Sequence, residues 1–528
     1  MRQWMVAAKK ADFYVIAEKF HVDPVVARII RNREVIGEKN IRIYLGGNLS
    51  DLSDPHQMKD MDRLVEILAQ KIRKQVHIRI IGDYDVDGVT SSHLFLTALR
   101  RVGAKVDVVI PHRIQDGYGL SLHLLQQAKE DGVDTILTCD NGIAAIDEIA
   151  WAKAQKMTVL VTDHHAVPFE EHEGRRTEKK SLADAVVNPH QQDCGYPYKE
   201  LCGAGVAWNV IRVLYENYDM DKREAEDLLD FVAMATVCDV MSLTGENRIL
   251  VKEGLKRIRH TKNIGLQALM QACNVQPENI SAYHFGYVLG PCVNATGRLD
   301  TARHALRLFE TGQETEAEEI ARDLVDLNQE RKELTLQGVE MAKKLCEEGG
   351  YENDPVLVLF LPDVHESIAG LIAGRIREMY NRPVFVLTRG EEGVKGSGRS
   401  TENYSMYENM CGCAELFTKF GGHPMAAGLS LPEENVEKFR RKINENCPLT
   451  VEEVCPDIHI DMAMPVGYAS TELVHQFALL EPFGKDNPSP LFADRNLSIS
   501  RMWVIGKNRN VLRMSVLSCL LYTSPSPR

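Results

Sequence analysis

No apolar run in the 528-residue sequence approaches the roughly 20 residues that cross a membrane. The first residues, Met1 to Trp4, do not open an apolar secretory segment. The 12 cysteines include no CxxC pair, and Cys139 and Cys238 lie in apolar runs where a thiol stays buried and reduced. These absences exclude a membrane-spanning chain and predict a cytoplasmic protein.

The sequence also lacks an excess of positive charge. Its 62 basic and 75 acidic residues give a net charge of −13, which argues against a protein that coats nucleic acid non-specifically. A local basic groove beside an acidic, metal-filled site stays compatible with this balance, because bound cations offset the acidity. The length allows two or more domains, and the 44% apolar content is ordinary for a globular chain.

One short stretch carries three carboxylates at alternate positions: Asp83, Asp85 and Asp87. An apolar strand is expected before them at 76–81 and a helix after them at 89–101. Ligands of open α/β sheets bind at the carboxyl ends of strands, and clustered carboxylates suit hard cations such as Mg²⁺ or Mn²⁺. An EF-hand is excluded, because Leu94 stands where that loop needs a glutamate. For this motif alone, a solvated acidic turn remains the alternative.

Three further apolar runs end in acidic residues. They are 135–140 with Asp140, 158–165 with Asp163, His164 and His165, and 231–239 with Asp239. We expect each run to be a strand that ends beside the first motif. Four such strand ends in one domain are hard to attribute to chance. Isolated histidines usually pack or cap, but two after an aspartate at a strand end favour function.

Through DYDVDG, TCDNG, VTDHH and ATVCDV the chain resembles the DHH phosphoesterase superfamily, and within it the RecJ exonucleases. The resemblance implies a 5′→3′ exonuclease that cuts single-stranded DNA into 5′-mononucleotides, in DNA repair and recombination. The implied cofactors are two divalent cations, Mn²⁺ or Mg²⁺, about 3.5–4 Å apart. Single-stranded DNA is the implied partner, with a single-strand-binding protein and a helicase as further ones.

The same resemblance implies roles for the acidic and histidine residues. The metal ligands are Asp83 and Asp85 at the first ion, Asp87, His164 and Asp239 at the second, and Asp140 bridging both. Pyrophosphatase relatives carry a histidine where Ile81 stands here, so Asp83 is given that role. Asp163 is expected to orient His164 without binding metal. Asp140 and His165 are the expected catalytic residues, and His165 would bond a phosphate oxygen or protonate the leaving 3′-oxygen.

Strands and helices alternate over residues 76–188, which predicts an α/β fold with a largely parallel sheet. The expected strands are 76–81, 106–110, 134–139, 158–162 and 184–188. A helix over 314–348 would span roughly 50 Å at 1.5 Å per residue and could connect two domains.

A second, smaller α/β domain begins near residue 355 and resembles the DHHA1 domain. Its glycine-rich runs, 396–400 and 421–424, are expected to be turns whose backbone N–H groups approach a phosphate. The residues that the resemblance assigns to the 5′-phosphate are Arg298, Ser397, Arg399 and His423. Residues 111–119 resemble the family's phosphate-facing loop. The alternatives are a plain surface loop there, and arginines that only hold the domain interface.

From about residue 453 the pattern resembles the start of an OB-fold, with a hairpin at 499–505 and 510–516. An OB barrel needs five strands, so an incomplete OB-type β-barrel is expected. Residues 520–528 resemble translated sequencing-adapter DNA, so the residues from about 517 are expected to be non-native. The expected plan is therefore an N-terminal helical segment packed on the core (1–50), a DHH catalytic domain (51–313), a connecting helix (314–348), a DHHA1 domain (349–452), a partial OB-fold (453–516) and a non-native tail (517–528).

Other functions stay open at this point. An oligoribonucleotide or cyclic-dinucleotide phosphodiesterase, or an inorganic pyrophosphatase, would use the same chemistry. Those resemblances are to shorter chains without the OB-like tail. A DHH scaffold that only binds nucleic acid or partners would be expected to have lost metal ligands, and every principal carboxylate is present here.

Overall fold

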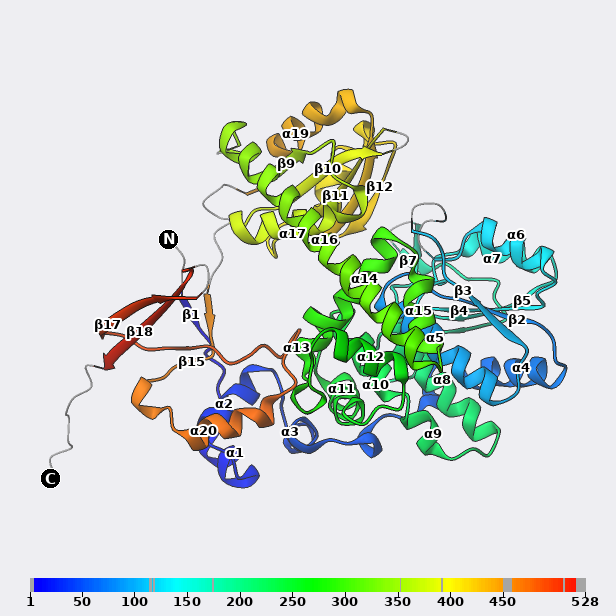
Figure 1. Cartoon of the computed structure of the whole chain (residues 1–528), viewed down its shortest axis with the longest axis horizontal. Helices are drawn as coiled ribbons and strands as arrows, with labels where there is room; N and C mark the ends of the chain where they lie inside the picture. The colour runs from blue at the N-terminus through cyan, green and yellow to red at the C-terminus, as the bar shows by residue number, and fades with distance from the viewer. Residues whose placement is uncertain are drawn as a thin grey trace. The chain divides into compact units, whose positions relative to one another are not determined.

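The computed structural model describes residues 4–518 apart from 114–115, 117–118, 173–174, 352, 391–392, 450–457 and 507–508. The chain divides into two compact units (Figure 1). The larger unit comprises residues 52–241 and 250–456, and the smaller one combines residues 1–51, 242–249 and 457–528. None of the helices in the described ranges combines the length and the apolar character that a membrane span needs.

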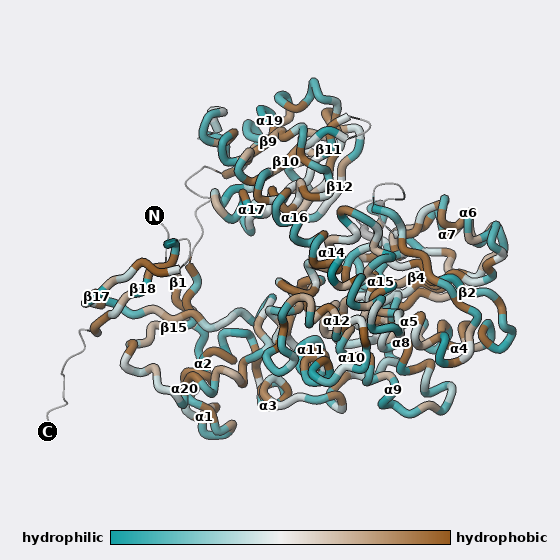
Figure 2. The backbone as a smooth tube through the Cα atoms, in the orientation of Figure 1, coloured by the Kyte–Doolittle hydropathy of each residue, from teal (hydrophilic) through white to brown (hydrophobic). Residues whose placement is uncertain are grey.

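The larger unit begins with a parallel five-stranded sheet of order β3-β2-β4-β5-β8. Its strands are β2 (Ile78–Ile81), β3 (Val106–Val109), β4 (Thr135–Cys139), β5 (Thr158–Thr162) and β8 (Ala185–Val187). Every residue of β2 and β4 is buried, as in sheets covered on both faces, and the surroundings of β4 are strongly hydrophobic in Figure 2. The predicted α/β fold with a parallel sheet is confirmed.

Helices cover this sheet and continue beyond it. They are α4 (Met61–Arg73), α5 (Val86–Arg101), α6 (Leu122–Glu130), α7 (Ile146–Ala154), α8 (Gly203–Asn217), α9 (Lys222–Glu226), α10 (Leu229–Cys238), α11 (Gly245–Ile258), α12 (Ile264–Ala272), α13 (Ala282–His284), α14 (Gly290–Leu299), α15 (Ala302–Glu310) and α16 (Glu314–Glu348). Leu125 of α6 and Ile149 of α7 pack with Ile136 of β4 in one core cluster. The long helix α16 has the bounds that its composition predicts.

The strand expected over 231–239 is wrong, because these residues form helix α10 and its C-cap. The run is buried from Leu229 to Thr236, so it shows no polar face. A short apolar run without periodicity fits a buried strand and a buried helix equally well. Asp239 therefore follows a helix, not a strand.

A second sheet lies within the larger unit and has the order β12-β13-β11-β10-β9. Its elements are β9 (Leu357–Phe360), α17 (Glu366–Tyr380), β10 (Val384–Gly390), β11 (Gly393–Arg399), α18 (Met406–Cys411), β12 (Lys419–His423), β13 (Ala426–Leu431) and α19 (Val436–Glu445). The predicted glycine-rich turns are wrong: 396–399 lie in β11 and 421–423 in β12. A Cβ on Gly396 would meet Leu387 Cδ2 at 2.4 Å, and one on Gly398 would meet Met406 Sδ at 2.5 Å. These glycines let side chains pack closely against a strand.

The smaller unit joins both ends of the described chain. Its elements are β1 (Trp4–Val6), α1 (Phe13–Phe20), α2 (Pro24–Asn32), α3 (Glu38–Gly46), β14 (Ile458–Ile460), β15 (Met462–Ala463), α20 (Thr471–Phe477), β16 (Phe492–Ala493), β17 (Leu497–Ile505) and β18 (Val511–Ser518). β1 pairs with β14 in parallel, and buried Arg248 donates to Tyr44 O at 2.7 Å and Leu480 O at 2.9 Å. Buried residues of α1, α2 and α3 thus share a core with Met464, Leu473 and Leu480 of the C-terminal segment, although the sequence predicts separate parts.

The predicted hairpin forms from β17 and β18. Its pairing continues to Leu517 and Ser518, so these two residues extend the native pattern into the segment expected to be a non-native tail. Residues 519–528 lie outside the described residues. Within the described part, β17 and β18 make a two-stranded sheet and no closed barrel forms, which fits an incomplete OB-type domain.

Candidate active site

The predicted carboxylates gather at the carboxyl edge of the first sheet. Asp83 follows β2 and Asp140 follows β4, where its positive φ of 60° is one that aspartate tolerates better than most residues. Asp85 is the N-cap of α5 and accepts from Gly88 N at 3.0 Å, while Asp87 lies in the first turn of that helix. The three motif carboxylates are therefore divided between a loop, a cap and a helix, not held on one loop.

Two donor sets meet at this edge. The ligand atoms of Asp83, Asp85 and Asp140 all lie within 4.8 Å of one another, and so do those of Asp87, His164 and Asp239. A third group of the same tightness combines Asp140, His164 and His165. The structure thus brings together the two ligand sets expected from the sequence, with Asp140 beside both.

His164 shows most directly what this arrangement can bind. Its Nε2 lies 3.1 Å from Asp140 Oδ1 and 3.6 Å from an oxygen of Asp87 and of Asp239. That buried nitrogen has no hydrogen-bond partner among the described residues. Burial lowers the pKa of His164, which favours the neutral imidazole that binds metals. A lone pair facing three carboxylates fits a cation placed between them.

The carboxylates give the same indication. Burial, followed by the charge of Asp85, raises the pKa of Asp83, and burial, followed by the charges of Asp87 and Asp85, raises the pKa of Asp140 well above its usual range. Buried Asp83 Oδ1 also has no hydrogen-bond partner within the described chain. Divalent cations would remove this repulsion. The donors present, oxygen with one imidazole, fit Mn²⁺ or Mg²⁺.

Backbone donors at the N-terminus of α8 hold Asp87. Gly203 N donates to Asp87 Oδ2 at 2.6 Å and Ala204 N to Asp87 Oδ1 at 2.7 Å, where the helix dipole also favours negative charge. A Cβ on Gly203 would lie 2.6 Å from Asp140 Cβ, so only glycine fits here. The sequence shows glycines in this helix, but it does not show which carboxylate their N–H groups reach.

Asp163 contacts a different histidine from the expected one. Its Oδ1 accepts from His165 Nδ1 at 2.7 Å, and its contact with His164 is to the backbone N at 2.7 Å. The expectation that Asp163 orients the His164 ring is therefore wrong. Burial acts against a charged His165, but the bond to Asp163 dominates and raises the pKa of His165 to about 9. This shift favours the protonated form of His165 at neutral pH.

Helix α14 connects the carboxylate loop with the second sheet. Asn294 Oδ1 accepts from Val86 N at 3.2 Å, and a Cβ on Gly297 would meet Tyr84 O at 2.4 Å. One residue later, Arg298 Nη1 donates to Ser367 O at 2.8 Å. Residues 294–298 of α14 thus pack on residues 84–86 and extend an arginine toward α17.

Three arginines lie close enough to influence one another. Burial, followed by the charge of Arg113, lowers the pKa of Arg298 to about 10 and also lowers that of Arg399. None of the three forms an ion pair with a carboxylate in the described ranges. The sequence singled out the segment around Arg113 without assigning that residue, whose guanidinium lies 5.0 Å from the Tyr84 ring centre. Mutually repelling arginines without acidic partners fit a phosphate.

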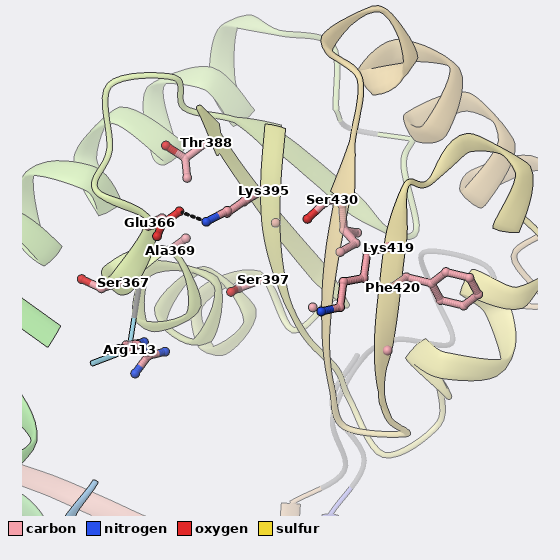
Figure 3. A pocket seen from close by; sticks show the side chains of 14 residues that line it. Arg113, Glu366, Ser367, Ala369, Thr388, Lys395, Ser397, Lys419, Phe420 and Ser430 are labelled. Atoms are coloured by element: carbon pink, nitrogen blue, oxygen red, sulfur yellow. Dashed lines mark ion pairs between the residues drawn. The ribbon is translucent and has the colours of Figure 1, made fainter. Parts of the chain in front are cut away.

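The second sheet arranges its polar side chains in rows across β11, β13 and β12. We name them by register: the arginine row (Arg399, Ala426, His423), the glycine row (Ser397, Gly428, Gly421) and the lysine row (Lys395, Ser430, Lys419). Ser397 and Arg113 both line a cavity on this sheet (Figure 3). His423 lies in the arginine row and is exposed. Ser397, Arg399 and His423 therefore share one sheet surface.

Comparison with known proteins identifies the family. The DHH family N-terminal domain matches residues 77–236, the DHHA1 domain 353–447 and the RecJ OB domain 460–519. The single-stranded-DNA-specific exonuclease RecJ of Haemophilus influenzae is 34% identical over 511 residues, which cover 93% of this chain and 86% of that protein. The chain belongs to the RecJ family. The Escherichia coli RecJ is 33% identical, with 92% of this chain and 85% of the relative covered.

The other RecJ comparisons agree. The chain spans 62% of the Bacillus subtilis RecJ, at 33% identity over 95% of its own length. A solved RecJ from Thermus thermophilus in complex with Mn²⁺ matches with a TM-score of 0.81 and 27% identity, covering 99% of this chain and 75% of that one. An exonuclease RecJ bound to manganese matches with a TM-score of 0.64 and 32% identity, covering 75% and 97%. Metal complexes of RecJ proteins thus have the fold seen here.

Proposed function

We propose that this chain is a metal-dependent exonuclease that degrades single-stranded DNA from its 5′ end and releases 5′-mononucleotides, in DNA repair and recombination. The observation that carries the proposal is His164 Nε2, buried without a hydrogen bond and facing the oxygens of Asp87, Asp140 and Asp239. The relatives named as single-stranded-DNA-specific exonucleases supply the substrate class.

Asp83 and Asp85 would hold one divalent cation, and Asp87, His164 and Asp239 would hold the second. Asp140, which lies beside both sets, would contribute to both ions. When bound, the two ions supply an activated water and stabilise negative charge on the reacting phosphate. The N-terminus of α8 keeps both oxygens of Asp87 oriented through Gly203 and Ala204. The site is held by backbone donors and strand ends, so its geometry needs little rearrangement when substrate arrives.

His165 supplies the proton that the leaving group needs. Hydrolysis breaks the bond between phosphorus and the 3′-oxygen of the terminal nucleotide, and that oxygen must gain a proton. His165 is protonated at neutral pH, because Asp163 accepts from its Nδ1, which leaves Nε2–H to donate. Asp163 is a positioning residue, since it acts only through His165.

The arginines determine the polarity. A 5′ end carries a terminal phosphate with more charge than an internal diester, and arginine forks with a hydroxyl suit such a group. Arg113, Arg298, Arg399 and Ser397 supply these donors between α14 and the second sheet, and His423 extends the arginine row. A 5′-phosphate held there places the next phosphodiester at the cations.

We also propose that the protein works in the cytoplasm with a single-strand-binding protein and a helicase.

The test is a degradation assay with single strands labelled at either end, in Mn²⁺ or Mg²⁺. We expect mononucleotides to appear first from the 5′ end, and we expect EDTA to stop hydrolysis until excess Mn²⁺ is added. The conservative variant His164→Gln keeps a polar side chain but loses the imidazole, and it should lose activity and need more Mn²⁺. Mononucleotides released first from the 3′ end, or hydrolysis undiminished in EDTA, would contradict the proposal.

A further inference from the structure

The cavity on the second sheet extends beyond the residues that the proposed function uses. Its volume is about 390 Å³. Arg113 and Ser397 line it, and Lys395, Lys419 and Ser430 of the lysine row line it as well (Figure 3). A pocket of this size is comparable to sites that take small molecules. A single phosphate at Ser397 would leave much of it empty.

The charge of the cavity indicates what could fill the remaining space. Among the described residues that line it, the cations of Arg113, Lys395 and Lys419 stand against one carboxylate, that of Glu366. Lys395 Nζ lies 2.8 Å from Glu366 Oε2, and both side chains keep some exposure. Lys419 is exposed and forms no ion pair within the described chain. This balance favours an anion with more than one negative charge.

The register places that anion relative to the 5′-phosphate. Along β11, Ser397 stands two residues from Lys395, a distance of about 7 Å at the usual rise of a strand. The glycine row between arginine and lysine rows has no side chains on β13 and β12, because Gly428 and Gly421 stand there. A ligand can therefore lie flat across the sheet from Ser397 to Lys419. The added anion must be linked closely to the first phosphate.

We propose that the lysine row binds the outer phosphates of a 5′-triphosphate, so that the enzyme accepts strands with 5′-triphosphorylated ends. This inference rests on the proposed function, which places the innermost phosphate at Ser397. Lys419 and Ser430 donate to the outer phosphates, and Lys395 joins them as it exchanges Glu366 for the ligand. Strands that a polymerase starts from a nucleoside triphosphate carry such ends, so that class of reaction supplies the substrate.

Binding without hydrolysis tests the cavity directly. Three single strands of one sequence, with a 3′ fluorophore and a 5′-hydroxyl, 5′-monophosphate or 5′-triphosphate, are titrated with the full chain in EDTA and followed by anisotropy. We expect the triphosphate strand to bind at least as tightly as the monophosphate strand. Lys419→Gln should weaken triphosphate binding about tenfold and change monophosphate binding less than about twofold. A triphosphate strand that binds more weakly than the monophosphate strand overturns the inference.

Two further variants separate this site from a general attraction to nucleic acid. Glu366→Gln frees Lys395 and should strengthen triphosphate binding, the opposite sign to Lys419→Gln. The control Lys438→Gln removes one positive charge from α19, where Lys438 Nζ contacts Asn435 Oδ1 at 3.0 Å. It should change the binding of neither the triphosphate strand nor the monophosphate strand. Equal weakening of all three strands by Lys419→Gln overturns the inference. Thermal unfolding of each variant shows whether it is folded.

A free nucleoside triphosphate has the same chemistry as the strand end, so ATP is added as a competitor. We expect ATP to displace the triphosphate strand only at far higher concentration, because it lacks the following nucleotides. If ATP binds as tightly as the strand, the cavity is a nucleotide site and the strand-end inference is overturned. A degradation assay in Mn²⁺ distinguishes a failure of the proposed function from a failure of the inference about the cavity. Failure to cut the 5′-monophosphate strand counts against the proposed function, whereas cutting that strand and rejecting the triphosphate strand counts against the cavity alone.

Discussion

The two α/β regions of the larger unit bury charges of opposite sign. At the edge of the first sheet, burial raises the pKa values of Asp83, Asp85 and Asp140. Between α14 and the second sheet, burial lowers the pKa values of Arg298 and Arg399. Each cluster is unfavourable alone, because like charges are held together away from water. In the proposed function each cluster would become favourable with its ligand, cations in one case and a phosphate in the other.

The difference lies in how rigidly each cluster is held. The carboxylates stand at strand ends and helix starts, and backbone N–H groups fix Asp87 and Asp85. The arginines are long side chains on α14 and β11, and they donate to the backbone carbonyls of Ser367 and Gly398. Two-metal chemistry needs fixed distances between the ligands, whereas binding the end of a strand needs long side chains that extend to it. We therefore expect changes in the first cluster to affect turnover and changes in the second to affect the choice of end.

The largest effect should come from Asp140, the carboxylate that lies beside both donor sets. Asp140→Asn keeps the size of the side chain and removes its charge, so turnover should fall by at least about a thousandfold, equivalent to roughly 4 kcal/mol of transition-state stabilisation. Asp147→Asn, an exposed aspartate on α7, is the matched control. Turnover of Asp140→Asn within tenfold of the parent would show that this residue is not a bridging ligand. Thermal unfolding should show that Asp140→Asn is folded, because less repulsion remains.

Asp163→Asn should have the next largest effect, although Asp163 belongs to neither donor set. The amide cannot hold His165 in its charged form, so proton donation to the leaving 3′-oxygen weakens and single-turnover rates should fall about 10- to 100-fold. Binding of single strands in EDTA should change little. If the loss instead appeared only in binding, Asp163 would serve the fold and not the reaction.

Arg399→Ala tests the other cluster. The parent should degrade 5′-phosphorylated strands faster than 5′-hydroxyl strands, and the variant should lose most of that difference, about tenfold. Arg389→Ala is a matched control from the same sheet, because Arg389 pairs with Glu433 at the surface. Rates on 5′-hydroxyl strands should stay within about twofold for both variants. An unchanged preference in Arg399→Ala would show that this arginine only supports the domain interface.

The carboxylate and arginine clusters also differ in how much of each can be predicted from the sequence. The carboxylate cluster follows from strand ends, which apolar runs ending in aspartate reveal, and α16 has the bounds that its composition predicts. The identity of the histidine held by Asp163 does not follow, because it depends on ring orientation. Nor do the backbone donors of Gly203 and Ala204, since any residue carries an N–H.

The second region is predicted less well. Its motif residues are present, but glycine-rich runs indicate turns and strands with close neighbours equally, and here they are strands. The rows of side chains exist only through the pairing register of β11, β13 and β12, in which β11 is paired with residues of β13 more than 20 positions further along the chain. Arg113 joins the cluster through tertiary contact with Tyr84. Long-range register is the information that a single sequence lacks.

His93 offers the smallest test, because it is a buried ionisable group outside both clusters. Its ring packs 4.4 Å from Phe231 and 5.9 Å from Phe309 between ring centres, and burial lowers its pKa to about 3. The unfolded chain takes up this proton near pH 6.5, so the unfolded state binds more protons between pH 6.5 and about 3. Lowering the pH within this range should therefore reduce the free energy of unfolding, by about 1.4 kcal/mol per pH unit.

The effect is isolated by comparing the free energy of unfolding of the parent with that of His93→Phe at several pH values. The parent should lose stability relative to the variant as pH falls below 6.5. Asp230, whose pKa burial raises to about 6, acts in the opposite direction in both proteins and cancels in the difference. A difference that stays flat with pH would mean that His93 is protonated in the folded state. His93 would then resemble the two clusters, in which charged groups are buried. If the difference in the free energy of unfolding changes with pH, His93 is buried in its neutral form.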